Sequence, residues 1–383
     1  MKPLPFNAPL RDYDLQAEML LDGWRTRDRE AVDIIRHYHP RFLDEKITWL
    51  PKRMTEEEAT RVPIALDDTR VALARWYTFA DWSRLAEYVR AVTTEGSPVA
   101  LFESAVEAII NGDAPALSML QRDHSELVRA RSTRVTWQDP HVHAATLLHY
   151  IAANGVEGHR QKSPKNAVEI ATLLLKAGAE VDALAYMYGG EATTMSMLVS
   201  STPPARAGVQ IPLLHTLIDF GASVEDRGKG EWTSPLMTAL AFGFSDTARA
   251  LVERGARVGS LAAAAGLGRV DEVQRLLPEA DALGRHRALA LAAQHGYSDI
   301  VGLLLDAGED PNRFNPKGNH AHSTPLHQAV LAGHDSVVRL LVERGAHVDI
   351  HDQIYRGTAL GWANYAGQKE IAAYLEAHGA KDD

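Results

Sequence analysis

The sequence predicts an all-α protein, in which an array of stacked helical hairpins follows a small helical domain. Its 383 residues exceed one ordinary compact domain of about 100–200 residues, so the chain holds several domains or a repeat array. An apolar phrase closed by glycine, such as RLLVERGA at 339–346, recurs with a period of about 33 residues and some insertions. The glycines that close this phrase are Gly178, Gly221, Gly255, Gly308, Gly345 and Gly379.

The composition is that of a folded globular protein, with 45% apolar and 23% charged residues. The chain has no cysteine, which excludes disulfides, thiolate metal sites and cysteine nucleophiles. A net charge of −10 argues against nucleic-acid binding, because phosphate contacts require clustered lysine and arginine. No stretch approaches the roughly 18 apolar residues of a membrane span, and no secretory signal is visible. We therefore expect a cytoplasmic protein that does not enter a membrane.

Residues 1–98 predict an N-terminal helical domain. Apolar residues at helical spacing in 14–39 form two groups on either side of a polar stretch, which predicts a pair of helices. A polar loop then leads to a further helical segment at 71–92. This segment is rich in aromatic residues, which we expect to pack in a core that caps the array rather than to form a ligand cage. They are Trp76, Tyr77, Phe79 and Trp82.

Residues 99–383 predict about seven to eight hairpins, of which the segment 101–128 is a divergent first one. The clearest unit begins at Thr324, a suitable N-cap, and Pro325 fits the first helical turn, where its missing N–H costs nothing. Gly333 and Gly345 stand where the two helices end. One such pair cannot bury its apolar face alone, so neighbouring pairs must stack.

This unit resembles the ankyrin repeat, whose signature is a T-P-L-H start, a short helix, a glycine turn, a second helix and a closing G-A. The resemblance covers about residues 100–380 and implies an all-α ankyrin-repeat solenoid with an N-terminal helical capping domain. It also implies that His327 bonds between adjacent repeats rather than catalysing a reaction. The segment 71–92 resembles a helical module often found ahead of ankyrin arrays in bacterial proteins. The residues that carry this second resemblance are Phe79, Ala80, Trp82 and Leu85.

Three insertions interrupt successive repeats, at 156–166, 183–194 and 201–210. Insertions in successive repeats map to loops on one face, so we expect them to cluster. An alternative hypothesis is therefore an enzyme or small-molecule sensor, with a pocket formed by the inserted loops within 141–210. In that hypothesis His143 or His149 acts as acid or base, and Tyr186 or Tyr188 orients the substrate.

Two further features of this region could form ligand sites. His141 and His143, with His149 as a third ligand, could bind a metal ion, but no carboxylate stands at a motif spacing. The basic stretch HRQKSPK, at 159–165, could receive a phosphate, although a solvated loop is the simpler interpretation. The sequence accordingly predicts neither a metal nor a cofactor.

The ankyrin resemblance implies that partners bind to the finger tips and to the faces of the first helices. Aligning the repeats places a set of histidine, aromatic and other residues on that concave side. They are His143, Asn154, Trp232, Phe242, His286, His295, His320, Leu331, Tyr355 and Tyr365. Aromatic residues are typical of contact sites. We therefore predict a non-catalytic protein-binding scaffold, whose acidic balance favours a basic or neutral protein partner.

Overall fold

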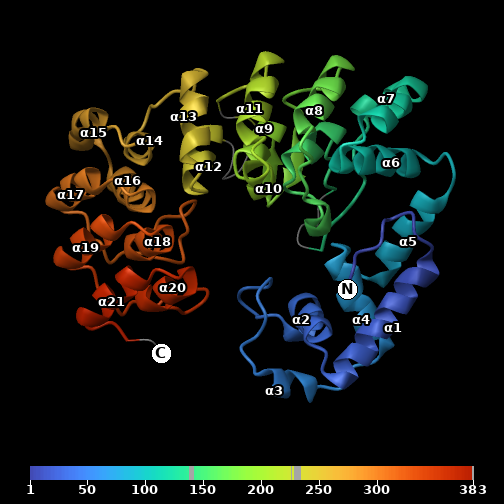
Figure 1. The fold of residues 1–383 in the computed structure, drawn as a ribbon, viewed down its shortest axis with the longest axis horizontal. Helices are drawn as coiled ribbons and strands as arrows, with labels where there is room; N and C mark the ends of the chain where they lie inside the picture. Colours follow the sequence, from blue (N-terminus) through green and yellow to red (C-terminus); the bar gives the residue numbers. More distant parts are fainter. Residues whose placement is uncertain (138–141, 226, 228–233, 382–383) are drawn as a thin grey trace. The chain divides into compact units, whose positions relative to one another are not determined.

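The computed structural model describes residues 1–137, 142–225, 227 and 234–381. Helices dominate the chain, which confirms the predicted all-α class (Figure 1). The chain divides into two compact units, and each consists of two segments. The first unit comprises Met1–Ala222 and Arg227–Gly230, and the second comprises Ser223–Asp226 and Glu231–Asp383.

The first unit begins with five helices that share an apolar core. They are α1 (Leu10–Thr26), α2 (Arg29–Tyr38), α3 (Glu56–Thr60), α4 (Leu66–Trp76) and α5 (Trp82–Thr93). The Asp28 side chain caps α2 by accepting from the Ala31 N–H at 3.0 Å. Tyr77 and Phe79 are buried in the core, while Trp76 and Trp82 pack at its edge. The predicted core role therefore holds fully for the first two rings and partly for the other two.

Helical hairpins follow in the same unit. Their helices are α6 (Pro98–Asn111), α7 (Ala114–Asp123), the 3-10 helix Leu147–Ala152, α8 (Ala167–Lys176), α9 (Thr194–Leu198), α10 (Thr202–Arg206) and α11 (Gln210–Asp219). First helices stack on first helices, in the order α6, 147–152 and α9. Second helices stack likewise, in the order α7, α8 and α11. Because α5 also packs against α6, the N-terminal helices and these repeats form one compact body. The domain boundary at residue 98 stays a prediction.

The insertions are more ordered than the sequence suggests. Residues 183–194 form an antiparallel hairpin, with β1 (Ala185–Met187) paired to β2 (Gly190–Ala192). Its two turn residues, Tyr188 and Gly189, both have positive φ (54° and 75°), as the tight turns of two-residue hairpins require. The loop expected at 201–210 was wrong, because α10 occupies 202–206 and takes its two prolines in the first turn, where they cost no hydrogen bond.

The second unit is a regular series of helix pairs. They are α12 (Pro235–Ala241) with α13 (Ser245–Glu253), α14 (Leu261–Gly266) with α15 (Val270–Leu276), α16 (Ala282–His295) with α17 (Ser298–Asp306), α18 (Pro325–Ala332) with α19 (Asp335–Glu343), and α20 (Ala359–Ala366) with α21 (Lys369–Ala377). The first helices of adjacent pairs stack on one another, and the second helices do the same, as the orange-to-red part of Figure 1 shows. A continuous apolar core results, with Leu304, Val330 and Leu341 fully buried.

The repeat motif at 324–327 forms as expected. Thr324 and His327 form a capping box at the start of α18, in which the Thr324 hydroxyl also hydrogen-bonds the His327 Nδ1 at 2.8 Å. The other ring nitrogen of His327 lies 3.2 Å from the carbonyl oxygen of Gly357, which belongs to the next repeat. The predicted role of His327 between repeats is thereby confirmed. Among the described residues, no helix is both long enough and apolar enough to cross a membrane.

Candidate functional site

The insertion 156–166 carries a buried ionic network rather than a solvated loop. Arg160 is 2% exposed, and its Nη1 lies 2.6 Å from Glu103 Oε2 and 3.5 Å from Glu157 Oε2. Arg134, also buried, forms an ion pair with the other oxygen of Glu157. Although burial raises it, the pKa of Glu157 is lowered to about 2 by the two guanidinium groups. The expectation of a solvated basic loop was thus wrong for Arg160, because each buried charge needs a partner.

Aromatic rings from the N-terminal helical region enclose this network. The Arg134 guanidinium lies 4.4 Å from the ring centre of Phe79 and 4.7 Å from that of Phe6. Arg160 lies 5.0 Å from the ring centre of Phe6. Cations over ring faces are attracted by the ring quadrupole, more strongly where water is excluded. The insertion therefore packs the repeats of the first unit against the N-terminal helical region.

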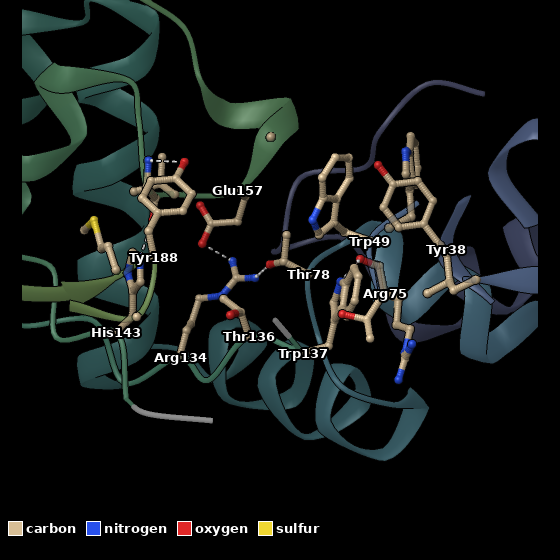
Figure 2. Close-up of a pocket in the computed structure, with 18 of the residues that line it drawn as sticks. Tyr38, Trp49, Arg75, Thr78, Arg134, Thr136, Trp137, His143, Glu157 and Tyr188 are labelled. Carbon is tan, nitrogen blue, oxygen red and sulfur yellow. Dashed lines mark hydrogen bonds and ion pairs between the residues drawn. The ribbon is translucent and has the colours of Figure 1, made fainter. Parts of the chain in front are cut away.

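A cleft of about 1150 Å³ opens beside the Arg134–Glu157 ion pair, within the first unit. Figure 2 shows His143 and Tyr188 on one side of this pair, and Trp49 and Tyr38 on the other. The alternative hypothesis from the sequence expects a pocket formed by the inserted loops within 141–210. The structure supplies the opposite wall from the N-terminal residues, which lie about a hundred positions away in the chain.

Trp137 enters this wall through contacts with the end of α4. Its backbone N–H donates to the Thr78 carbonyl at 3.1 Å, and its indole Nε1 donates to the Arg75 carbonyl at 3.0 Å. The Arg75 guanidinium lies over the Trp137 ring, 4.9 Å from its centre. This pairing could not be predicted, because Trp137 stands in an irregular segment that shows no periodicity.

His149 is placed differently from the catalytic hypothesis. It is completely buried, its Nδ1 hydrogen-bonds Thr146, and its Nε2 lies 3.3 Å from the Ala192 carbonyl oxygen. Burial lowers its pKa to about 4, so the ring is neutral near pH 7. It does not line the cleft, and a role as acid or base toward a ligand there conflicts with its position.

The remaining residues of that hypothesis do lie at the cleft. The His143 Nε2 is hydrogen-bonded to the Gly155 carbonyl. The Tyr188 hydroxyl donates to Asn154 Oδ1 at 2.8 Å, and Tyr186 lines the wall beside it. These contacts tie the hairpin to the loop at 154–155, where a Cβ on Gly155 would meet Met187 Sδ at 2.2 Å. His141, the partner in the metal alternative, lies outside the described residues.

Several residues predicted for the concave surface are instead engaged inside the protein. Asn154 donates to Ser200 Oγ at 2.7 Å, and His286 Nε2 bonds the Phe314 carbonyl at 2.8 Å. His295 bonds Ser245 Oγ and the Leu240 carbonyl, both at 2.8 Å, and His320 bonds the Ala241 carbonyl at 2.8 Å. The three imidazoles satisfy carbonyl groups at helix ends and in loops. His286 is buried, whereas His295 and His320 are partly exposed, so their place on a binding surface stays a prediction. Trp232 lies outside the described residues.

Four of the predicted contact residues are exposed, and all belong to the second unit. Phe242 is 43% exposed, Leu331 43%, Tyr355 57% and Tyr365 89%. Leu331 and Tyr365 each stand two residues before the glycine at which α18 and α20 end. Because α18 stacks on α20, these two side chains occupy equivalent positions on adjacent helices. We call these four residues the exposed repeat face.

Comparison with protein families identifies the repeats of the second unit. A model described as three copies of the ankyrin repeat matches residues 314–383, and a single-repeat model matches residues 286–316. The chain carries ankyrin repeats. The matches fall in the second unit, where the hairpins are most regular, whereas the hairpins of the first unit are interrupted by insertions.

The relatives are eukaryotic ankyrin-repeat proteins. The mouse (Mus musculus) "Ankyrin repeat and SAM domain-containing protein 6" is 37% identical over 111 residues, which is 29% of this chain and 12% of the relative. The Caenorhabditis elegans "Ankyrin repeat and KH domain-containing protein mask-1" is 31% identical over 220 residues, 55% of this chain and 8% of the relative. The chain therefore spans only a small part of the length of these relatives. Neither the bacterial origin nor the bacterial type of N-terminal module is supported by them.

Proposed function

We propose that the ankyrin repeats of the second unit bind a protein partner through the exposed repeat face. The observation that carries this proposal is the pair Leu331 and Tyr365, two large apolar side chains left in solvent at equivalent positions of stacked helices. Side chains of this kind bury large areas on binding and dominate interface energies when they cluster.

A series of contacts within the second unit runs from the neighbour of Phe242 to Tyr355. His320, in the loop before α18, bonds the carbonyl of Ala241, the neighbour of Phe242. Its ring lies 6.3 Å from that of His322, which in turn lies 5.7 Å from the ring of Tyr355. The end of α12 is thus linked to the loops that precede α18 and α20.

Rigidity favours this surface as a binding site. The helices beneath it are fixed by a fully buried core, so the exposed side chains need little ordering when a partner arrives. A basic or neutral partner fits the net charge of −10, because opposite charges steer association. We propose that the protein meets this partner in the cytoplasm.

The test is affinity capture from the native host, followed by binding measurements with the purified partner. The double variant Leu331→Ala and Tyr365→Ala should weaken the complex at least about tenfold. Its control is Leu283→Ala, which removes a side chain of similar exposure (53%) at the start of α16. That control should change the affinity by less than about twofold, since it lies outside the face.

Because both substitutions remove exposed side chains, the free energy of unfolding should change by less than about 0.5 kcal/mol for each of them. A partner whose affinity is unchanged by the double variant, or reduced equally by Leu283→Ala, would show that the exposed repeat face is not the binding site.

A further inference from the structure

We infer that the cleft of the first unit binds a small molecule that combines a planar aromatic ring with an anionic group. This inference is independent of the partner proposed for the second unit. It concerns a different set of residues, only some of which could be expected from the sequence to lie together.

The first support is the aromatic lining of the cleft. Rings come from four separate stretches of the chain, and two of them are open to solvent: Trp49 is 48% exposed and Tyr188 is 59% exposed. Figure 2 shows Tyr188 on one side of the Arg134–Glu157 ion pair, with Trp49, Tyr38 and Trp137 on the other. Exposed rings that face a common space favour a planar ligand, which can stack on them or meet their edges.

The second support is the charge balance of the lining. Arg134 is paired with Glu157, and Lys52 Nζ lies 3.9 Å from Glu45 Oε1. Asp44 accepts hydrogen bonds from the backbone N–H groups of Lys46 and Ile47. Arg75 is different, because it makes no ion pair with any carboxylate in the described part of the chain.

The position of Arg75 adds to this argument. Its Nε is buried and has no hydrogen-bond partner among the described residues, and partial burial lowers the pKa of its guanidinium group. The Trp137 ring lies against the guanidinium. An anion at this point would supply the missing partner, and charge-assisted hydrogen bonds from arginine are strong and directional.

Further donors stand in the same wall. The Tyr38 hydroxyl and the Trp49 indole N–H donate to no residue that the structure describes, and both line the cleft. The buried ion pair lies between the two aromatic sides, so they do not form one continuous apolar groove for an extended peptide. The volume of about 1150 Å³ suffices for a ring, its anionic group and bound water.

The experiment compares two fluorescent dyes that differ by one charge. The first is 1-anilinonaphthalene-8-sulfonate, and the second is its uncharged parent N-phenyl-1-naphthylamine. With the full chain, the sulfonate dye should bind more tightly, and indole-3-carboxylate should displace it. Arg75→Gln should weaken the sulfonate dye about tenfold and the neutral dye less than about twofold. Trp137→Leu should weaken both dyes, because it removes a ring from the wall.

The matched control is Arg84→Gln, which removes an exposed arginine of α5 that does not line the cleft. It should leave both affinities unchanged, as should Tyr365→Ala in the second unit. Arg75→Lys keeps the positive charge and should keep the preference for the sulfonate dye, which separates loss of charge from misfolding. In the unmodified protein, added salt should reduce that preference, since salt screens exposed charges.

Three results would overturn the inference. One is equal binding of the two dyes by the unmodified protein, or no binding of either. Another is dye binding that neither Arg75→Gln nor Trp137→Leu changes, which indicates non-specific apolar contact. The third is displacement by an acidic tyrosine-containing peptide but not by indole-3-carboxylate, which would make the occupant a peptide.

Discussion

The two units of this protein differ in the make-up of their interiors. In the second unit, regular hairpins stack around aliphatic residues such as Leu304, Val330 and Leu341. In the first unit, the interior around the insertion 156–166 holds four charged side chains, each at most 3% exposed. They are Glu103, Arg134, Glu157 and Arg160. Only Glu157 and Arg160 belong to the insertion, and each pairs with a charged residue outside it, so the surrounding structure supplies the partners that the inserted charges need.

One motif, a threonine followed three residues later by a histidine, is present in both units and allows them to be compared at equivalent positions. His149 and His327 each bond a threonine three residues before them through Nδ1, and each bonds a backbone carbonyl through Nε2. The carbonyl belongs to Ala192 of the inserted hairpin in the first case and to Gly357 of a regular loop in the second. The repeat motif therefore tolerates an insertion in its neighbour, provided that a carbonyl remains in reach.

The largest expected effect comes from removing one member of the ionic network. Arg160→Met should lower the free energy of unfolding of the first unit by about 3–5 kcal/mol, because Glu103 and Glu157 lose a buried partner. Hydrogen exchange of the first unit measures this loss, while protection in the second unit should be unchanged.

The control is Arg339→Met in the second unit, which removes an exposed ion pair with Asp335. Such pairs contribute less than about 1 kcal/mol. If the two arginine variants lose the same stability, the network is not the element that holds the first unit together.

A smaller loss is expected from a cavity in the regular core. Leu304→Ala should destabilise the second unit by about 3 kcal/mol, because the packed hairpins around it cannot collapse fully. Exchange should rise in the neighbouring repeats and not in the N-terminal helices. The exposed Leu283→Ala is the matched control, and a similar loss in both variants would contradict an interior role for Leu304.

A graded effect is expected when the pH is changed. Burial lowers the pKa of His149 and of His159 from 6.5 to about 4. The unfolded histidines take up protons between pH 6.5 and 4, whereas the folded ones do not. The first unit should therefore lose stability progressively as the pH falls through this window. Glu157, with its pKa lowered to about 2, adds a further loss below pH 4.5.

Stability curves of the first unit at several pH values measure this dependence, and nuclear magnetic resonance can follow the two rings directly. His149→Gln should flatten the curve between pH 6.5 and 4, while His37→Gln, at an exposed position, should leave it unchanged. A His149 ring that titrates near 6.5 in the folded protein would refute the prediction.

Much of the fold could be predicted because it depends on local patterns. Thr324, Pro325, Gly333 and Gly345 mark the start and ends of helices through their own backbone preferences. The exposed positions of Leu331 and Tyr365 follow from the same helical spacing. The internal bonds of His286, His295 and His320 could not be predicted, since the carbonyl groups that they reach lie 28 to 79 residues away.

The sequence by itself determined the period, the helix pairs and the resemblance to ankyrin repeats, because each depends on residues within one turn or one repeat. Only the tertiary structure determined how the insertions fold and which residues they contact. It placed Arg160 among carboxylates and aromatic rings, and it brought Arg75 and Trp137 together across 62 positions. The physical reason is that a buried charge or an aromatic ring interacts with the groups that lie nearest to it in space. Spacing along the sequence does not give that distance.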